Sequence, residues 1–217
     1  MNIEQARFNM IEQQIRTWNV LDANVLSLLA MVRREDFVPA AYRSLAFCDT
    51  ELPLPEGQSM LVPRLEARLL QEASVQRHER VLEIGSGSGF MAALLAHRAQ
   101  SVVTLERIPA LARLAAENLR RSAIVNVSVR EADGCEGLAS EAPFDVILLS
   151  GSVASVPQAL LQQLRLGGRL IGVVGAEPMM RATRVLRSAE ARFDAVELFD
   201  TVAPRLVGFD EPTQFRF

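Results

Sequence analysis

The chain has 217 residues, of which 49% are hydrophobic and 23% charged, and its formal net charge is −3. This composition suits one globular domain with a well-filled core and an N-terminal extension, and the slight negative charge argues against general nucleic-acid or membrane-surface binding. All 23 basic residues are arginines, which excludes Schiff-base and lysine-nucleophile chemistry.

The cysteines and histidines do not indicate a metal site. Cys48 and Cys135 lack the spacing of a zinc or redox pair, and His78 and His97 have no cysteine near them in the sequence. The acidic and polar start of the chain does not resemble a signal peptide, and no apolar run reaches membrane-spanning length. We therefore expect a cytoplasmic protein with no metal and no membrane partner.

The first part of the chain predicts short helices. Residues 3–17 form an amphipathic pattern whose apolar face carries Ile3, Phe8, Ile11 and Ile15. Asp22 is placed to cap a second helix that runs to Val32. A polar turn at 33–36 and one or two helical turns within 37–47 follow. These helices are expected either to be a structural flap or to form a wall over a ligand site.

Residues 49–63 are the least regular stretch of the chain. Three prolines and a glycine exclude a long helix or a central strand, yet five apolar side chains argue against a floppy linker. This pattern predicts a partly apolar lid. Ser59 within it is either a substrate contact or a turn residue bonded to its own backbone. We expect residues 1–63 to form the helical extension and lid, and residues 64–217 to form the ligand-binding domain.

Residues 64–217 alternate between helical and strand patterns. Helices are expected at 64–76, 90–97, 108–121 and 156–166, the last capped by Gly167 and Gly168. Strands are expected at 81–84, 101–106, 125–130, 144–151 and 169–175, with two further strand-like segments at 193–199 and 204–209. This alternation predicts an α/β fold: a Rossmann-like, seven-stranded, mostly parallel sheet with helices on both faces.

A glycine turn between the first strand and its helix is the strongest motif. Gly85, Gly87 and Gly89, with Ser86 between the first two, follow the strand directly. Glycines there allow a ligand close to the backbone, and the amides at the helix start favour polar or negative ligand groups. The spacing G-x-G-x-G differs from the dinucleotide fingerprint G-x-G-x-x-G, so it favours an adenosine-type ligand other than a nicotinamide cofactor.

Polar side chains at four strand ends predict the rest of one site. Glu83 faces a ligand's cationic amino end, as in S-adenosylmethionine, or accepts from the glycine-turn amides. Glu106 is placed to bind ribose hydroxyls, the alternative being a solvated charge. Asp133 accepts the adenine amine or forms an Asp-Gly turn with Gly134. Ser150 ends the fourth strand. Because the carboxyl ends of parallel strands meet at one edge, these side chains are expected to lie together.

The chain resembles the protein-L-isoaspartate O-methyltransferases, a family of class I S-adenosylmethionine-dependent enzymes. The motifs that carry the resemblance are Met10–Arg16, Arg34–Pro39, Val81–Gly89, Glu106–Pro109, Asp133–Gly134, Ala142–Asp145, Val156–Leu161 and Gln163–Leu170. The resemblance implies S-adenosyl-L-methionine as cofactor and a protein or peptide partner whose isomerised aspartates are esterified at the carboxylate. It also implies that Arg107, beside Glu106, lies at the cofactor site. Since a carboxylate nucleophile is already ionised at neutral pH, this reaction needs no general base.

One motif departs from this family. The family carries Thr-Ile-Ser, a variable residue and Pro in the lid, whereas this chain has Ser59-Met-Leu-Val-Pro63. Leu61 therefore replaces the serine whose hydroxyl is thought to hold the substrate carboxylate, and Ser59 is left as the candidate catalytic hydroxyl. The alternatives are a relative with a different acceptor, either a small molecule or another protein group, and a cofactor-binding module without catalysis. A nicotinamide oxidoreductase is the weakest alternative, because the glycine spacing and Glu83 disfavour it.

Overall fold

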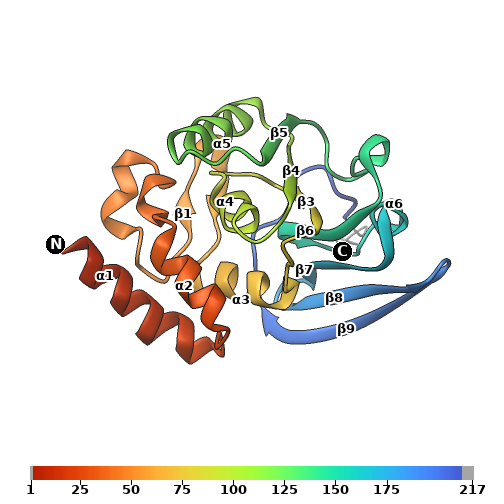
Figure 1. Ribbon diagram of the computed structural model, residues 1–217, viewed down its shortest axis with the longest axis horizontal. Coiled ribbons are helices and arrows are strands. Elements are labelled where there is room, and N and C mark those ends of the chain that lie inside the picture. Colours follow the sequence, from red (N-terminus) through yellow and green to blue (C-terminus); the bar gives the residue numbers. More distant parts are fainter. Residues whose placement is uncertain (1, 212–217) are drawn as a thin grey trace, which may run out of the picture.

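The computed structural model describes residues 2–211 and has a seven-stranded sheet at its centre (Figure 1). The strands of this sheet are β3 (Arg80–Ile84), β4 (Ser101–Glu106), β5 (Val127–Glu131), β6 (Phe144–Val153), β7 (Leu164–Ala176), β8 (Met179–Ala189) and β9 (Arg192–Thr201). Their order is β5-β4-β3-β6-β7-β8-β9, parallel from β5 to β7 and antiparallel in the last two pairings. The predicted α/β fold is confirmed.

The helices are short and most of them precede or follow a parallel strand. They are α1 (Ile3–Asn9), α2 (Ala23–Met31), α3 (Pro63–Ala73), α4 (Phe90–Ala96), α5 (Pro109–Arg121) and α6 (Gln158–Gln162). The predicted cap of α2 is confirmed, since the Asp22 side chain accepts from Asn24 N at 2.7 Å and from Val25 N at 3.4 Å. Within residues 2–211, none of these helices has both the length and the apolar character needed to cross a bilayer.

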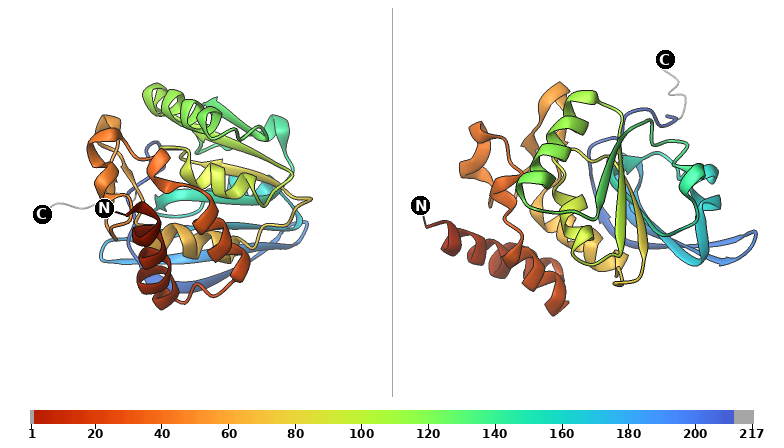
Figure 2. Two further views of the ribbon diagram at one scale, coloured as in Figure 1. Left: turned by 60° about the vertical axis from the view of Figure 1, so that its left-hand side comes forward. Right: turned by 45° about the horizontal axis from the view of Figure 1, so that its top comes forward.

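The two faces of the sheet are covered unequally, as the right-hand view in Figure 2 shows. Alternate residues of a strand point to opposite faces, so neighbours along β3 join different apolar clusters: Val81 packs in the cluster with α2–α5, and Leu82 in the cluster with α6. The cluster with α2–α5 also contains the N-terminal segment. Helices therefore lie on both faces, as predicted, but one face carries only α6 and irregular segments.

The strand order reverses beside β3. From β3 the chain moves outward through β4 and β5, and then returns to place β6 on the other side of β3. Connections that leave adjacent parallel strands in opposite directions open a crevice at their carboxyl ends. The glycine turn after Ile84 and the small residues Ser150 and Gly151 of β6 lie at this crevice.

The first helical segment differs from the prediction in its buried face. After α1, residues Met10–Ile15 are π-helical and Arg16–Trp18 form a 3₁₀ turn, so the register of side chains shifts along the segment. Phe8 is exposed and Ile3 is at the surface, whereas Arg7 is buried in an ion pair with Glu35. The predicted apolar face was therefore wrong for Ile3 and Phe8 and right for Ile11 and Ile15.

The helix predicted at 156–166 ends early. α6 stops at Gln162, and β7 begins at Leu164, which pairs with Phe144 before an irregularity in the ladder. Gly167, with φ of +81°, lies within that irregularity of β7 and does not cap a helix. Residues after Gln162 pair with β6 instead of continuing the helix. This pairing with a distant strand cannot be seen in a local sequence pattern.

The last strands were also misplaced. The prediction missed β8, whose arginines at positions 181, 184 and 187 obscure the alternation of a strand. Residues 204–209 are not a strand of the sheet, and contribute an isolated bridge between Arg205 and Ser152. β9 covers the segment predicted at 193–199, and the β8–β9 hairpin projects beyond the other strands in Figure 1.

The predicted lid is a small hairpin. β1 (Leu52–Pro53) and β2 (Ser59–Met60) pair antiparallel, and Leu52, Leu54, Met60 and Leu61 are buried. Apolar residues from both sides of residue 63 belong to one cluster. The division of the chain at residue 63 stays a prediction about the roles of its two parts.

Candidate functional site

A cleft lies at the carboxyl ends of β3, β4 and β6. Its walls come from the glycine turn, from the Glu106–Ile108 segment, from the lid at Leu54 and Ser59, and from residues 204–209. An inner part of the same cleft continues under the lid towards Glu83, Glu66 and Phe90. The structure thus brings most of the predicted site residues to one place, at the crevice where the strand order reverses.

The glycine turn needs its glycines for two different reasons. Gly85 has φ of +92°, and a Cβ there would lie 2.6 Å from Leu206 Cδ2. Gly89 has φ of +84° and begins α4, where a Cβ would approach Ala115 to 3.2 Å. Both conformations are costly for other residues. Gly85 therefore keeps the backbone open to the cleft, while Gly89 allows α4 to pack closely against α5.

Glu83 is fully buried and only half satisfied. Ser150 Oγ donates to its Oε1 at 2.6 Å, while Oε2 has no partner within the described residues. The glycine-turn amides do not serve it: Gly85 N and Ser86 N donate to Leu105 O, and Gly87 N donates to Glu106. Burial raises the pKa of Glu83 to about 8, outweighing the opposite effect of the Ser150 and Thr104 hydroxyls. A cationic ligand group would satisfy the free oxygen.

Glu106 at the end of β4 is fixed by the backbone. Its Oε2 accepts from Gly87 N at 2.9 Å and its Oε1 accepts from Ile108 N at 3.0 Å. It is buried, which disagrees with the alternative of a solvated strand-end charge. A carboxylate offers about four acceptor positions, so two remain for ligand hydroxyls at the cleft.

Arg107 and Asp133 pair with each other at the edge of the cleft. Arg107 Nη1 donates to Asp133 Oδ2 at 2.7 Å, and Asp133 Oδ1 accepts from Cys135 N at 3.2 Å, as in an Asp-Gly turn. Gly134 lines the cleft, whereas Asp133 itself does not. The Asp133 carboxylate thus bonds as expected for an Asp-Gly turn. Only its remaining lone pairs are available to a ligand.

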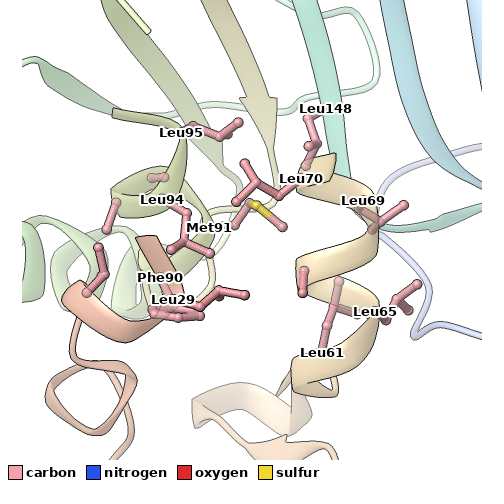
Figure 3. Close-up of a cluster of buried hydrophobic side chains, with 14 of the residues drawn as sticks. Leu29, Leu61, Leu65, Leu69, Leu70, Phe90, Met91, Leu94, Leu95 and Leu148 are labelled. Atoms are coloured by element: carbon pink, nitrogen blue, oxygen red, sulfur yellow. The ribbon is translucent and has the colours of Figure 1, made fainter. Parts of the chain in front are cut away.

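Ser59 and Leu61 lie differently on the lid. Ser59 lines both parts of the cleft, and its Oγ donates to Glu51 Oε2 at 3.1 Å rather than to its own backbone. Leu61 is 5% exposed and packs with Leu65 and Phe90 in the apolar cluster of Figure 3. Leu61, which replaces the serine of the protein-L-isoaspartate O-methyltransferase motif, is therefore part of the core at the inner end of this cleft.

Two features of the site were not predicted. Ser86 lines the inner cleft, but its hydroxyl is hydrogen-bonded to Thr104 Oγ1 at 2.6 Å. Residues 204–209, predicted as a strand, form a wall in which Leu206 lies against Gly85. Pro204 and Gly208 within this segment were the sequence signal that it is not a regular strand. Among the described residues, no group of three or more His, Cys, Asp or Glu side chains could hold a metal ion.

The seven-stranded Rossmann-like sheet, with a glycine turn after β3, has the fold of a methyltransferase. The chain belongs to the protein-L-isoaspartate(D-aspartate) O-methyltransferase family, whose model matches residues 5–202. It is 41% identical over 202 residues to the protein-L-isoaspartate O-methyltransferase of Koribacter versatilis, covering 93% of this chain and 90% of that one. The enzyme of the same name from Methanoculleus marisnigri is 37% identical over 202 residues, covering 93% and 91%.

Solved structures agree on the fold. A Plasmodium falciparum crystal structure assigned to the protein-L-isoaspartate O-methyltransferases, in complex with S-adenosyl-L-homocysteine, has a TM-score of 0.79. It covers 94% of this chain and 97% of its own at 19% identity. A second structure of the same enzyme name has a TM-score of 0.80 at 24% identity, covering 93% and 66%. The similarity extends over nearly the whole described chain, the N-terminal segment included.

Proposed function

We propose that this chain transfers a methyl group from S-adenosyl-L-methionine to the carboxylate of isomerised aspartates in damaged proteins or peptides. The observation that carries the proposal is the unpartnered Oε2 of Glu83, buried beside the cleft of a chain that belongs to this family. The donor's ammonium group would satisfy that oxygen. The pyrophosphate of a nicotinamide cofactor offers no cationic group to it.

The other cleft residues fit the same cofactor. Gly85 leaves the backbone accessible, Glu106 keeps acceptor positions for the ribose hydroxyls, and Gly134 lines the cleft beside Ile84. Apolar walls from Ile84, Ile108 and Leu206 suit a base. When bound, S-adenosyl-L-methionine supplies an electrophilic methyl group on a sulfonium, and the protein supplies its orientation.

The acceptor side needs alignment more than acid–base chemistry. A carboxylate with an ordinary pKa near 4 is ionised at neutral pH, so no base has to remove a proton. The lid holds the acceptor in line and keeps water out, because Leu54 and Met60 cover the inner cleft with apolar surface. Ser59 is the candidate hydroxyl for the acceptor carboxylate, once it exchanges its bond to Glu51 for one to the substrate.

The two parts of the chain have separate roles in this proposal. Residues 1–63 supply the lid and the wall behind it, on the acceptor side, and residues 64–217 hold the cofactor. We infer a protein or peptide partner, because an isomerised aspartate occurs within a polypeptide.

A second candidate is a relative with another methyl acceptor. Two observations favour it: Leu61 occupies the core where a hydroxyl is expected, and the Ser59 hydroxyl donates to Glu51, whose carboxylate would repel an acceptor carboxylate. The cofactor and its site are the same in both candidates, so they differ only in the group that receives the methyl.

Two measurements test the proposal. Calorimetry should give much tighter binding of S-adenosyl-L-methionine than of NAD; tighter NAD binding would reject both candidates. Methyl transfer is then followed to a peptide with one isoaspartyl residue, with the aspartyl peptide of identical sequence as control. Transfer to the isoaspartyl peptide alone supports repair activity. Tight cofactor binding without transfer to either peptide would favour the second candidate.

A further inference from the structure

Arg34 is a buried arginine that contacts three separate segments. It is 1% exposed, and it follows α2 in a short 3₁₀ turn at Arg34–Asp36. Its Nε donates to Ala46 O at 3.1 Å, its Nη2 donates to Leu61 O at 2.9 Å, and its Nη1 forms an ion pair with Glu66. One side chain thus holds the backbone before the lid, the backbone at the end of the lid and the first turn of α3.

The same guanidinium also reaches the cofactor side of the cleft. Its central carbon lies 5.0 Å from the centre of the Phe90 ring, and Phe90 is the first residue of α4, directly after the glycine turn. Leu61, Glu66 and Phe90 all line the inner cleft next to Glu83. Arg34 therefore lies behind the inner cleft and links its acceptor wall to its cofactor wall.

The geometry requires an arginine. The partners lie in different directions around a planar fork of donors, and the flat cation rests near an aromatic ring. A lysine ammonium has the charge but cannot reach the Ala46 and Leu61 carbonyls and Glu66 together. Removing the side chain would leave two buried carbonyls and the Glu66 carboxylate without their partner.

We propose that Arg34 is a positioning residue for methyl transfer: it fixes the Leu61 carbonyl, and with it the lid that carries Ser59, against the glycine turn. It touches neither cofactor nor acceptor. The inference rests on the proposed function and deepens it, because it assigns acceptor placement to a residue outside the cleft. Its loss should impair use of the acceptor much more than binding of the cofactor.

Arg7 provides a matched control. It is also buried, at 4% exposed, and also pairs with a buried carboxylate, Glu35, next to an aromatic ring, that of Phe47 at 5.7 Å. Its other ion-pair partner is Glu4 on the same helix. None of these partners lies between residues 54 and 62 of the lid. Replacing Arg7 therefore removes the same kind of buried ion pair without releasing the lid.

The experiment compares Arg34→Met, Arg34→Lys and Arg7→Met. Three quantities are measured: kcat/KM for an isoaspartyl peptide, the Kd of S-adenosyl-L-methionine, and hydrogen exchange of residues 58–62. Both Arg34 variants should lose at least about tenfold in kcat/KM, as expected for a misplaced lid, with Kd changed less than about threefold and faster exchange of the lid. Arg7→Met should keep kcat/KM within about threefold of the parent and leave lid exchange unchanged.

A double variant covers the case in which Arg34→Met folds poorly. Arg34→Met with Glu66→Leu replaces the buried pair by apolar groups, which restores stability in many proteins. Its kcat/KM should stay low. The proposal is overturned if this double variant regains parental kcat/KM, if the two methionine variants lose kcat/KM equally, or if lid exchange is unchanged in Arg34→Met. If the parent protein methylates no isoaspartyl peptide, the proposed function fails, while lid exchange still tests Arg34.

Discussion

At the scale of a single residue, Glu83 is costly to bury but is well suited to bind a cationic ligand group. Its side chain is fully buried in the sheet, the Ser150 hydroxyl bonds one carboxylate oxygen, and the other oxygen has no hydrogen-bond partner among the described residues. A buried carboxylate without enough hydrogen bonds favours its neutral form. Binding a cationic group reverses that preference, so protonation and ligand binding at Glu83 are coupled.

The first prediction is that cofactor affinity depends on pH through Glu83. Since burial raises its pKa to about 8, the free protein is mostly protonated at this site at pH 7. An ammonium ligand needs the carboxylate, so binding near pH 7 releases a proton, and affinity rises about tenfold per pH unit up to about pH 7.5. Above about pH 8 the affinity falls again, because the α-amino group of the ligand loses its own proton there. Calorimetry at pH 6.5–9 in buffers of different ionisation enthalpy measures both effects.

Glu83→Gln is the control for this coupling. The variant should bind S-adenosyl-L-methionine more weakly at pH 8.5, release no proton and show a flatter pH profile. A parent protein whose affinity and proton release do not change between pH 6.5 and 8.5 would show that Glu83 does not face the ammonium group.

The second prediction concerns Leu61. If the absent hydroxyl limits isoaspartyl activity, Leu61→Ser should raise methyl transfer to the isoaspartyl peptide. Because Leu61 is buried in the same apolar cluster as Leu65 and Phe90, the same change should cost about 3 kcal/mol of unfolding free energy. Urea unfolding and initial rates measure the two effects. Leu61→Ala makes a similar cavity without a hydroxyl, and a serine variant no more active than it would place the limit elsewhere.

At the scale of elements, the glycine turn and the 204–209 segment form one unit. Leu206 lies so close to Gly85 that a methyl group at Gly85 would contact it at 2.6 Å. The backbone bonds from Ser152 N to Pro204 O and from Leu206 N to Ser152 O hold this segment against β6. The segment therefore supports the cofactor turn although it lies about 120 residues further along the chain.

The third prediction is that Gly85→Ala weakens cofactor binding through both backbone conformation and the contact with Leu206. Gly167→Ala is the matched control: its φ of +81° is similar, but an added Cβ meets nothing within 4 Å. Both variants should lose about 1 kcal/mol of stability from the positive φ. Only Gly85→Ala should raise the Kd, and Leu206→Ala added to it should recover part of the affinity. Equal Kd values for both glycine variants would contradict this account.

At the scale of the whole molecule, the two roles proposed for the chain share one fold. The helices before residue 63 and the helices α3–α5 contribute to a single apolar cluster on one face of the sheet. Trp18 of the N-terminal segment lies edge-on to Phe199 of β9, with ring centres 6.4 Å apart. The guanidinium carbon of Arg64 lies over the Trp18 ring, 4.3 Å from its centre. Removing the first segment would expose much of this cluster.

The fourth prediction is that the protein unfolds in one cooperative transition. Trp18 is the only tryptophan, so its fluorescence reports on the N-terminal segment, whereas far-ultraviolet circular dichroism reports on the whole chain, sheet included. The two signals should have the same urea midpoint, because residues that share one apolar cluster unfold together. A fluorescence midpoint clearly below that of circular dichroism would mean that residues 1–63 fold as a separate unit.

The sequence alone determined the parallel part of the sheet, the glycine turn and the acidic strand ends, because these depend on local patterns: apolar runs, glycine spacing and residues that directly follow a strand. Only the tertiary structure decided which groups are left without partners. Glu83 and Ser150, Arg34 and Glu66, and Gly85 and Leu206 are contacts between residues 67, 32 and about 120 positions apart, which no local pattern specifies. β8 was missed and α6 was predicted too long for the same reason, since pairing with neighbouring strands outweighed the local preference of those residues.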